Sequence, residues 1–492
     1  MNKKNYVAVA TLAFAMLTSC AGQKEAKSTS GIDLANMDTT VSAGTDFFRY
    51  ACGGWNDAHP LTAEYSRYGT FDELFENSQK QLRELIEGLA AQKNNQAGSA
   101  AQKIGDLYNM AMDSVTLNKQ GAEPVKAMLD KIAGMKDKSE IVPMMTEMAH
   151  IGIGTYFRSY VYADPKNSSL NIFQMGQGGI NLGEKEYYLD TDSITQNIRE
   201  QYKLYIGKLF QLAGFSEADA QQKVADVMEV ETAIAKVSRS ATELRDPEAN
   251  YHKMSFDELK KTISGIDWDA YMKGLGIQVP AELNVEQVEP IQEVARLMNT
   301  LPLSKHVSYL EYNLLDAAAS CLSDDFVAAR FDFYGKVLSG RQVNQPRWKR
   351  AVNSVNGMLG ELVGEVYVEK YFPAAAKERM VKLVKNLQTA LGERIDAQEW
   401  MSDSTKIRAH EKLATFHVKV GYPDKWKDYS KLEIKNDSYW ANVCRASEWG
   451  FNDMYSRIGK PVDKDEWLMT PQTVNAYYNP STNEICFPAA IL

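Results

Sequence analysis

The hydrophobic residues of this 492-residue chain recur mainly three and four positions apart. Because residues at these spacings lie on one face of an α-helix, the pattern predicts amphipathic helices packed on one another. We expect the first long helix to begin with a capping box between Thr70 and Glu73. Two examples of the pattern are Leu82, Leu85, Ile86 and Leu89, and Met380, Leu383, Val384 and Leu387.

The segment from residue 474 to the end of the sequence has a different pattern. Residues 474–478 and 484–487 are strand-like runs, and residues 479–483 between them have turn composition,. They predict a β-hairpin, which is marginal in water alone and must join a sheet with strands from elsewhere. The apolar end at residues 487–492 is unusual for a natural terminus, so we expect the sequence to be truncated there.

The start of the chain is typical of a targeting segment. Lys3 and Lys4 precede an apolar stretch that is shorter than the ~20 residues needed to span a bilayer, which predicts a signal peptide over residues 1–19,. Residues 17–20 resemble the lipobox of bacterial lipoproteins, which implies a lipid anchor on Cys20 and a tether over residues 20–35. We therefore expect export and attachment to a bacterial membrane. A plain secretory signal followed by a chance cysteine is the alternative.

Composition and charge narrow the functional classes. The chain is 44% hydrophobic, which is enough for a large core,. Its net charge of -9 opposes binding to a nucleic-acid backbone, so we expect no nucleic-acid partner,. Without Cys20, four cysteines remain, and none forms a CxxC pair. Three disulfide pairings, or free buried thiols, stay open. These cysteines are Cys52, Cys321, Cys444 and Cys486.

The best internal match to a metal motif is His410-Glu411, which resembles the start of HExxH,. The motif fails because residue 414 is Ala414. We expect His417 on the same helix face, roughly 10 Å along the axis, which is too far to share a metal easily. Ordinary surface or packed histidines are favoured, and the residues taken alone show no complete active site.

Ten segments in one order resemble the neprilysin-like zinc metallopeptidases. The match covers almost the whole chain after the targeting segment. The segments are residues 46–55, 66–72, 182–189, 245–247, 346–349, 400–401, 405–406, 420–423, 474–480 and 487–492.

This resemblance implies a mainly α protein with two lobes: a large all-helical lid lobe, and a thermolysin-like α+β catalytic lobe of which only the first β-hairpin is present. The corresponding parts are an N-terminal segment packing on the catalytic lobe (36–60), the helical lobe (61–460) and the start of the catalytic lobe (461–492). The family's HExxH helix, third zinc ligand and transition-state histidine do not occur before Leu492. We therefore expect no metal ligand or catalytic residue in this chain, no activity of the chain alone, and zinc only in the full-length enzyme.

The resemblance also implies a peptide-binding edge strand. Asn475 and Ala476 match the strand that binds an extended peptide through its backbone, and the small Ala476 side chain permits close approach. An ordinary sheet strand is the alternative.

Four more residues match the family's substrate cleft. Arg67 matches the residue that binds the C-terminal carboxylate of the substrate, and Asp72 matches the acid that orients it. Phe71 and Ile491 match the walls of an apolar pocket for the residue after the scissile bond. The alternatives are an ion pair at a helix start for the first two residues and core packing for the other two.

Together these observations predict a lipid-anchored, exported zinc metalloendopeptidase that acts on oligopeptides, represented here by its substrate-binding parts. A non-catalytic peptide-binding lipoprotein is the main alternative, and a helical surface-structural protein is a third. Because the hairpin and N-terminal segment would lack the lobe on which they pack, we also expect an exposed apolar patch and poor solubility.

Overall fold

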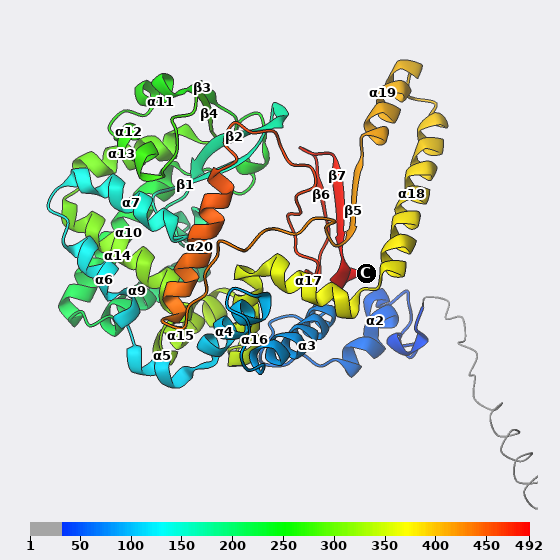
Figure 1. Cartoon of the computed structure of the whole chain (residues 1–492), viewed down its shortest axis with the longest axis horizontal. Helices are drawn as coiled ribbons and strands as arrows, with labels where there is room; N and C mark the ends of the chain where they lie inside the picture. The colour runs from blue at the N-terminus through cyan, green and yellow to red at the C-terminus, as the bar shows by residue number, and fades with distance from the viewer. Residues whose placement is uncertain (1–31) are drawn as a thin grey trace, which may run out of the picture. The chain divides into compact units, whose positions relative to one another are not determined.

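The computed structural model describes residues 32–492 (Figure 1). The predicted signal peptide, Cys20 and most of the predicted tether lie outside these residues. The chain divides into two compact units, the first ending at Thr62 and the second comprising Ala63–Leu492. Within residues 32–492, no helix is long and apolar enough to cross a membrane.

In its described part, the first unit contains the short 3₁₀ helix η1 (Leu34–Asn36) and α2 (Phe47–Ala58). The two elements pack closely at Gly54, where an added Cβ would lie 2.1 Å from the backbone oxygen of Ala35. Any side chain at this position would therefore push the two elements apart. This explains why the Gly-Gly-Trp segment carries a glycine here.

The second unit is mainly helical, which confirms the predicted fold class. Leu82 and Ile86 lie on the buried face of α3, as the periodicity predicts. The 3₁₀ and π segments are η2 (Lys138–Glu140), η3 (Glu243–Arg245), η4 (Ala319–Cys321), η5 (Phe331–Leu338, π) and η6 (Ala489–Ile491). The α-helices are α3 (Thr70–Ala90), α4 (Ala100–Met112), α5 (Ser114–Gln120), α6 (Glu123–Ala133), α7 (Ile141–His150), α8 (Glu186–Leu189), α9 (Ser193–Leu212), α10 (Glu217–Val237), α11 (Phe256–Thr262), α12 (Trp268–Gly274), α13 (Val288–Thr300), α14 (Leu303–Ala318), α15 (Asp324–Arg330), α16 (Arg347–Met358), α17 (Gly360–Tyr371), α18 (Ala374–Asp396), α19 (Asp403–Ala414) and α20 (Tyr439–Tyr455).

The predicted capping box of the first long helix is wrong by one residue. Helix α3 begins at Thr70 itself, so Gly69 is the N-cap and the third helical residue is Asp72. The Asp72 Oδ2 atom accepts a hydrogen bond of 2.9 Å from the Gly69 backbone N–H. Thr70 lies inside the helix, where its hydroxyl cannot serve as the cap.

Helix α18 forms where its periodicity predicts, but its apolar stripe is not packed. Leu383, Leu387 and Leu391 are 48%, 59% and 52% exposed. Of the 23 residues of α18, only Val384 and Ile395 are buried. Helices α18 and α19 lie side by side (Figure 1), and the leucine stripe of α18 is an exposed apolar patch that the sequence did not predict, because its periodicity indicated a packed helix face,.

A four-stranded sheet lies among the helices, so the lobe predicted to be all-helical contains strands. Its order is β1-β2-β4-β3, with β2 antiparallel to β1 and parallel to β4. Helical periodicity misses β2 because its second half is buried on both faces and includes polar residues: the Asn284 side-chain amide donates to Gln174 Oε1 at 3.1 Å. The strands are β1 (Phe157–Asp164), β2 (Asn167–Gln177), β3 (Lys253–Ser255) and β4 (Glu282–Val285).

The predicted C-terminal hairpin is confirmed as part of a second sheet. Its order is β5-β7-β6, with β7 parallel to β5 and antiparallel to β6 (Figure 1). As expected, a strand from elsewhere completes the sheet. The three strands are β5 (His417–Gly421), β6 (Tyr477–Asn479) and β7 (Glu484–Pro488).

The hairpin turn is tied to the end of α19. Asn483 has a left-handed backbone (φ 51°), a conformation that asparagine tolerates well,. Its side-chain amide donates to the Lys412 backbone oxygen at 2.9 Å and to Thr415 Oγ1 at 3.1 Å. Its backbone oxygen accepts from the N–H of His417 at 2.9 Å, at the first residue of β5.

The helical core contains one buried carboxyl group with three side-chain donors. Glu231 on α10 is completely buried, and its oxygens accept hydrogen bonds from the hydroxyls of Tyr188 and Tyr202 and from the amide of Asn181. Burial raises the pKa of Glu231 to about 7, against the opposing effect of these hydrogen bonds,. Near neutral pH this core therefore contains a carboxyl group that is only partly ionised.

Glu231 should make the fold less stable as the pH rises. Its pKa in the folded chain, about 7, exceeds the ordinary 4.5, so its contribution is fully present below pH 4.5 and is lost as the pH rises through 7. The E231Q variant cannot ionise. Between pH 4.5 and 7.5, the free energy of unfolding of the unsubstituted chain should fall by up to about 3 kcal/mol relative to E231Q. Urea titrations at matched pH values measure this difference. E217Q, at an exposed position on the same helix, is the control, and equal pH slopes for E231Q and the unsubstituted chain would contradict the prediction.

Candidate peptide-binding surface

Strand β6 forms one edge of the second sheet. It pairs with β7 through Tyr477↔Cys486, Tyr478↔Ile485 and Asn479↔Glu484. Within the described chain no strand pairs with its other edge. An unpaired edge offers backbone N–H and C=O groups to an extended peptide.

Asn475 and Ala476 lie just before β6, whereas the sequence placed them inside the strand. Asn475 is exposed and Ala476 is half-buried. The Ala476 backbone N–H donates to the Asn475 side-chain oxygen at 2.8 Å. The regular strand begins at Tyr477, three residues after the start of the predicted strand-like run at residue 474.

A buried ion pair joins β5 to the hairpin. Lys419 Nζ lies 2.8 Å from Glu484 Oε2, and the two side chains are 3% and 2% exposed. Lys419 Nζ also donates to the Glu466 backbone oxygen at 2.5 Å, and the Tyr477 hydroxyl donates to Glu484 Oε1 at 2.9 Å. Because buried charges are costly unless they are paired, these bonds hold the three strands in a single arrangement.

The segment that leads into β6 is attached to the helices. Gln472 is only 3% exposed. Its side-chain amide donates to the Gly360 backbone oxygen at 2.7 Å and to Asn356 Oδ1 at 2.5 Å. The backbone oxygen of Gln472 accepts from the Ser78 hydroxyl on α3 at 3.3 Å. The residues just before Asn475 are therefore fixed against α3, α16 and α17. Gln472 was not predicted from the sequence, and its position beside the matched segment 474–480 was the available signal.

Arg67 and Asp72 do not form the ion pair that the sequence allows. Asp72 is occupied with the cap of α3, as described above. Arg67 is exposed, and among residues 32–492 its guanidinium has no hydrogen-bond or ion-pair partner. The structure thus leaves this positive charge accessible to a ligand, and it shows no orienting contact from Asp72.

The two predicted pocket residues lie at α3 and at the end of the chain. Phe71, in the first turn of α3, is 61% exposed, so core packing does not explain this side chain. Ile491 is half-buried in η6, which packs against α3. The structure thus brings together the two elements that carry these side chains.

A buried lysine that sequence reasoning missed fixes the segment before Arg67. Lys349 Nζ on α16 is bonded to Glu64 Oε1 at 2.6 Å and to Glu76 Oε1. Burial opposes its charge, but the two carboxylates outweigh burial and raise the pKa of Lys349. The signal available in the sequence was its position in the matched segment 346–349.

Residues 32–492 contain no group of three His, Cys, Asp or Glu side chains that could hold a metal ion. Helix α19 ends at Ala414, so His417 begins β5 and does not share a helix face with His410, contrary to the prediction. His410 Nε2 lies 2.8 Å from Asp396 Oδ1, and His417 Nε2 lies 3.7 Å from Asp465 Oδ1. The described residues therefore do not fit a zinc ion.

The four cysteines in the described part of the chain are free thiols. Burial raises the pKa of the Cys321 thiol to about 11 and that of the Cys444 and Cys486 thiols to about 12. At neutral pH these three groups are protonated. They are therefore poor nucleophiles and poor metal ligands.

Comparison with known protein families identifies the family of this chain. The family model for peptidase family M13 matches residues 43–423. The chain belongs to peptidase family M13. This confirms the resemblance to the neprilysin-like zinc metallopeptidases.

M13 relatives match over nearly the whole chain. Endothelin-converting enzyme 1 of Rattus norvegicus is 30% identical over 484 residues, which cover 93% of this chain and 62% of the rat protein. The chain thus spans less than two thirds of the length of that relative. The crystal structure of the Mycobacterium tuberculosis zinc metalloprotease ZMP1 with an inhibitor is 34% identical, with a TM-score of 0.87 over 94% of this chain and 70% of that one. PEPO of Lactobacillus rhamnosis, 21% identical with a TM-score of 0.80 over 89% of this chain and 70% of that one, shares the fold.

Removing one partner of the buried ion pair should destabilise the chain strongly. K419M leaves the Glu484 carboxylate buried without its cation, which costs about 3–5 kcal/mol in comparable cases. The double variant K419M/E484L removes both charges and should recover most of this loss. Urea unfolding of the three proteins measures the difference. K260M, which breaks the exposed Lys260–Asp269 pair, is the control and should change stability by less than about 1 kcal/mol. A K419M variant as stable as K260M would contradict the assignment.

Proposed function

We propose that this chain provides the peptide-binding lobe of an exported, lipid-anchored zinc metalloendopeptidase that hydrolyses oligopeptides. Membership of family M13 supports the peptidase class. The observation that carries the substrate-binding role is the open edge of β6, which adjoins Asn475 and Ala476. Because residues 32–492 contain no metal-binding group, the zinc ligands and the general base are assigned to groups outside them.

In this proposal a peptide binds as an added strand along β6. Backbone bonds at the edge would hold the peptide in extended form with little dependence on its sequence. The side chain of Ala476 is small enough for close approach, and the exposed ring of Phe71 supplies apolar surface. Arg67 would bind the C-terminal carboxylate of the peptide, since its guanidinium is exposed and unpaired within the described chain.

A second candidate function is peptide binding without catalysis. The observation that favours it is the absence of a metal-binding cluster among residues 32–492. Such a lipoprotein would use the same β6 edge and the same Arg67. The two candidates therefore differ in zinc content and cleavage but share the peptide-binding surface.

The native protein, extracted from the membranes of its source cell, distinguishes these candidates. The proposed function predicts about one zinc ion per protein molecule and cleavage of a quenched fluorescent peptide that a zinc chelator abolishes. Peptide binding without zinc or cleavage would instead establish the non-catalytic candidate.

The lipid anchor is tested by the C20S variant. This variant should move from the membrane fraction to the soluble fraction, and unchanged partitioning would contradict the lipid anchor.

The role of Arg67 can be tested with matched peptides. R67A should weaken the binding of a peptide with a free C-terminal carboxylate about tenfold, because a charge-assisted hydrogen bond is lost. It should leave the binding of the C-terminally amidated peptide unchanged. Fluorescence anisotropy with the two peptides measures both affinities.

The control variant is R408A, which removes an arginine that is 80% exposed and paired with Glu411 on α19. It should bind both peptides as the unsubstituted chain does. If R67A weakened both peptides equally, or neither, carboxylate recognition by Arg67 would be refuted.

A further inference from the structure

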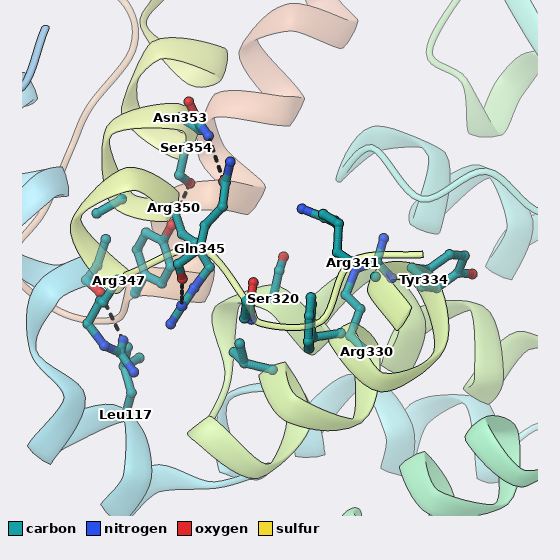
Figure 2. A pocket seen from close by; sticks show the side chains of 17 residues that line it. Leu117, Ser320, Arg330, Tyr334, Arg341, Gln345, Arg347, Arg350, Asn353 and Ser354 are labelled. Atoms are coloured by element: carbon teal, nitrogen blue, oxygen red, sulfur yellow. Dashed lines mark hydrogen bonds between the residues drawn. The ribbon is translucent and has the colours of Figure 1, made fainter. Parts of the chain in front are cut away.

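A cavity of about 440 Å³ lies where η5, the loop that follows it and α16 meet (Figure 2). Phe331 and Tyr334 from η5 and Tyr439 from the start of α20 give it apolar walls. It includes none of the residues of the peptide-binding surface described above.

Four arginines line this cavity, and no aspartate or glutamate does. Arg330 precedes η5 and Arg341 follows it, and both lie on one side of the cavity (Figure 2). Arg347 and Arg350, from α16, lie on the other side. The cavity therefore concentrates four positive charges in a chain whose net charge is -9. Like charges at close range repel one another unless anions compensate them.

Two of the four charges are compensated by carboxylates outside the lining. Arg330 pairs with Asp316 at 2.8 Å, and Arg347 pairs with Asp324. The other two, Arg341 and Arg350, have no ion-pair partner within residues 32–492.

The two uncompensated arginines differ in their contacts. Arg350 donates to the Gln345 backbone oxygen at 2.5 Å. The Nε atom of Arg341 is buried and makes no hydrogen bond within residues 32–492. A buried donor without a partner is costly, so a ligand that accepted a hydrogen bond from this N–H group would remove that cost. Burial lowers the pKa of Arg350, the neighbouring charge of Arg347 lowers it further, and the Asp324 carboxylate acts in the opposite direction.

The backbone after η5 places Arg341 at the cavity. Gly340 has a left-handed backbone (φ 70°), which lets the chain turn back on itself at the end of η5,. The Arg341 backbone N–H then donates to the Gly335 oxygen at 3.0 Å. The position of Arg341 is therefore set by the fold and does not depend on a free surface loop.

We propose that this cavity is a binding site for a small oxyanion of the phosphate or carboxylate type with at least two negative charges. Two uncompensated guanidinium groups match a dianion in charge, and the planar fork of arginine matches the geometry of both anion types. Arg341 and Arg350 are the principal ligands, and the aromatic walls hold the body of the bound molecule. This proposal goes beyond the proposed function and does not depend on it.

Calorimetric titration of the chain at low ionic strength tests the site. The probes are inorganic phosphate, pyrophosphate and citrate, so the series distinguishes phosphate from carboxylate ligands. We expect saturable binding of at least one probe with one site per chain, weakened by added salt. R341Q and R350Q should each weaken it about tenfold or more.

Two further variants make the test decisive. R408Q removes one positive charge at an exposed position of α19 and should bind as the unsubstituted chain does. R341K keeps the charge but loses the planar fork, so its affinity should lie between those of R341Q and the unsubstituted chain. It replaces R341Q if circular dichroism shows that R341Q is unfolded.

The proposal is overturned if none of the three probes binds saturably. It is also overturned if R408Q weakens binding as much as the cavity variants, because attraction would then reflect overall charge. The peptide assay with R67A is independent of both results, so this proposal and the proposed function can fail separately.

Discussion

The buried ion pair between Lys419 and Glu484 is the contact on which the small C-terminal sheet depends. It joins β5 to β7, which are more than sixty positions apart in the sequence. The hydroxyl of Tyr477 extends the same network to β6. Because a hairpin alone is marginal in water, the open edge of β6 exists only while this network holds the strands together. The candidate peptide-binding surface therefore depends on this buried ion pair as well as on the hydrogen bonds between the strands.

Much of this architecture could be read from local patterns. The helical periodicity located α3 and α18, and the runs around residues 479–483 located the hairpin. The four-stranded sheet was missed because residues such as Gln174 and Asn284 satisfy each other inside the core, which leaves no simple alternation. The α19 boundary was missed because the chain switches from helix to strand within two residues, between Ala414 and His417. The unpacked stripe of α18 was missed because periodicity shows that a helix has an apolar face and does not show what covers it.

Only part of the candidate site could be predicted from the sequence. Family resemblance indicated Arg67, Phe71 and the approach to β6, but it could not show that Asp72 serves as a helix cap. Lys349 and the arginine-lined cavity depend on contacts between segments far apart in the sequence, so no local motif reveals them. Net charge was equally uninformative, since an average of -9 over the chain conceals a concentrated positive cavity,.

The attachment of Asn483 to the end of α19 has a mechanical consequence. Its side chain and backbone link Lys412, Thr415 and His417 to the turn that joins β6 to β7. Helices α18 and α19 bury few of their side chains, so little packing resists their movement,. A movement of α18 and α19 would therefore act on the hairpin turn through the contacts of Asn483. A displacement of α19 would be transmitted through Asn483 to the turn between β6 and β7, next to the peptide-binding edge.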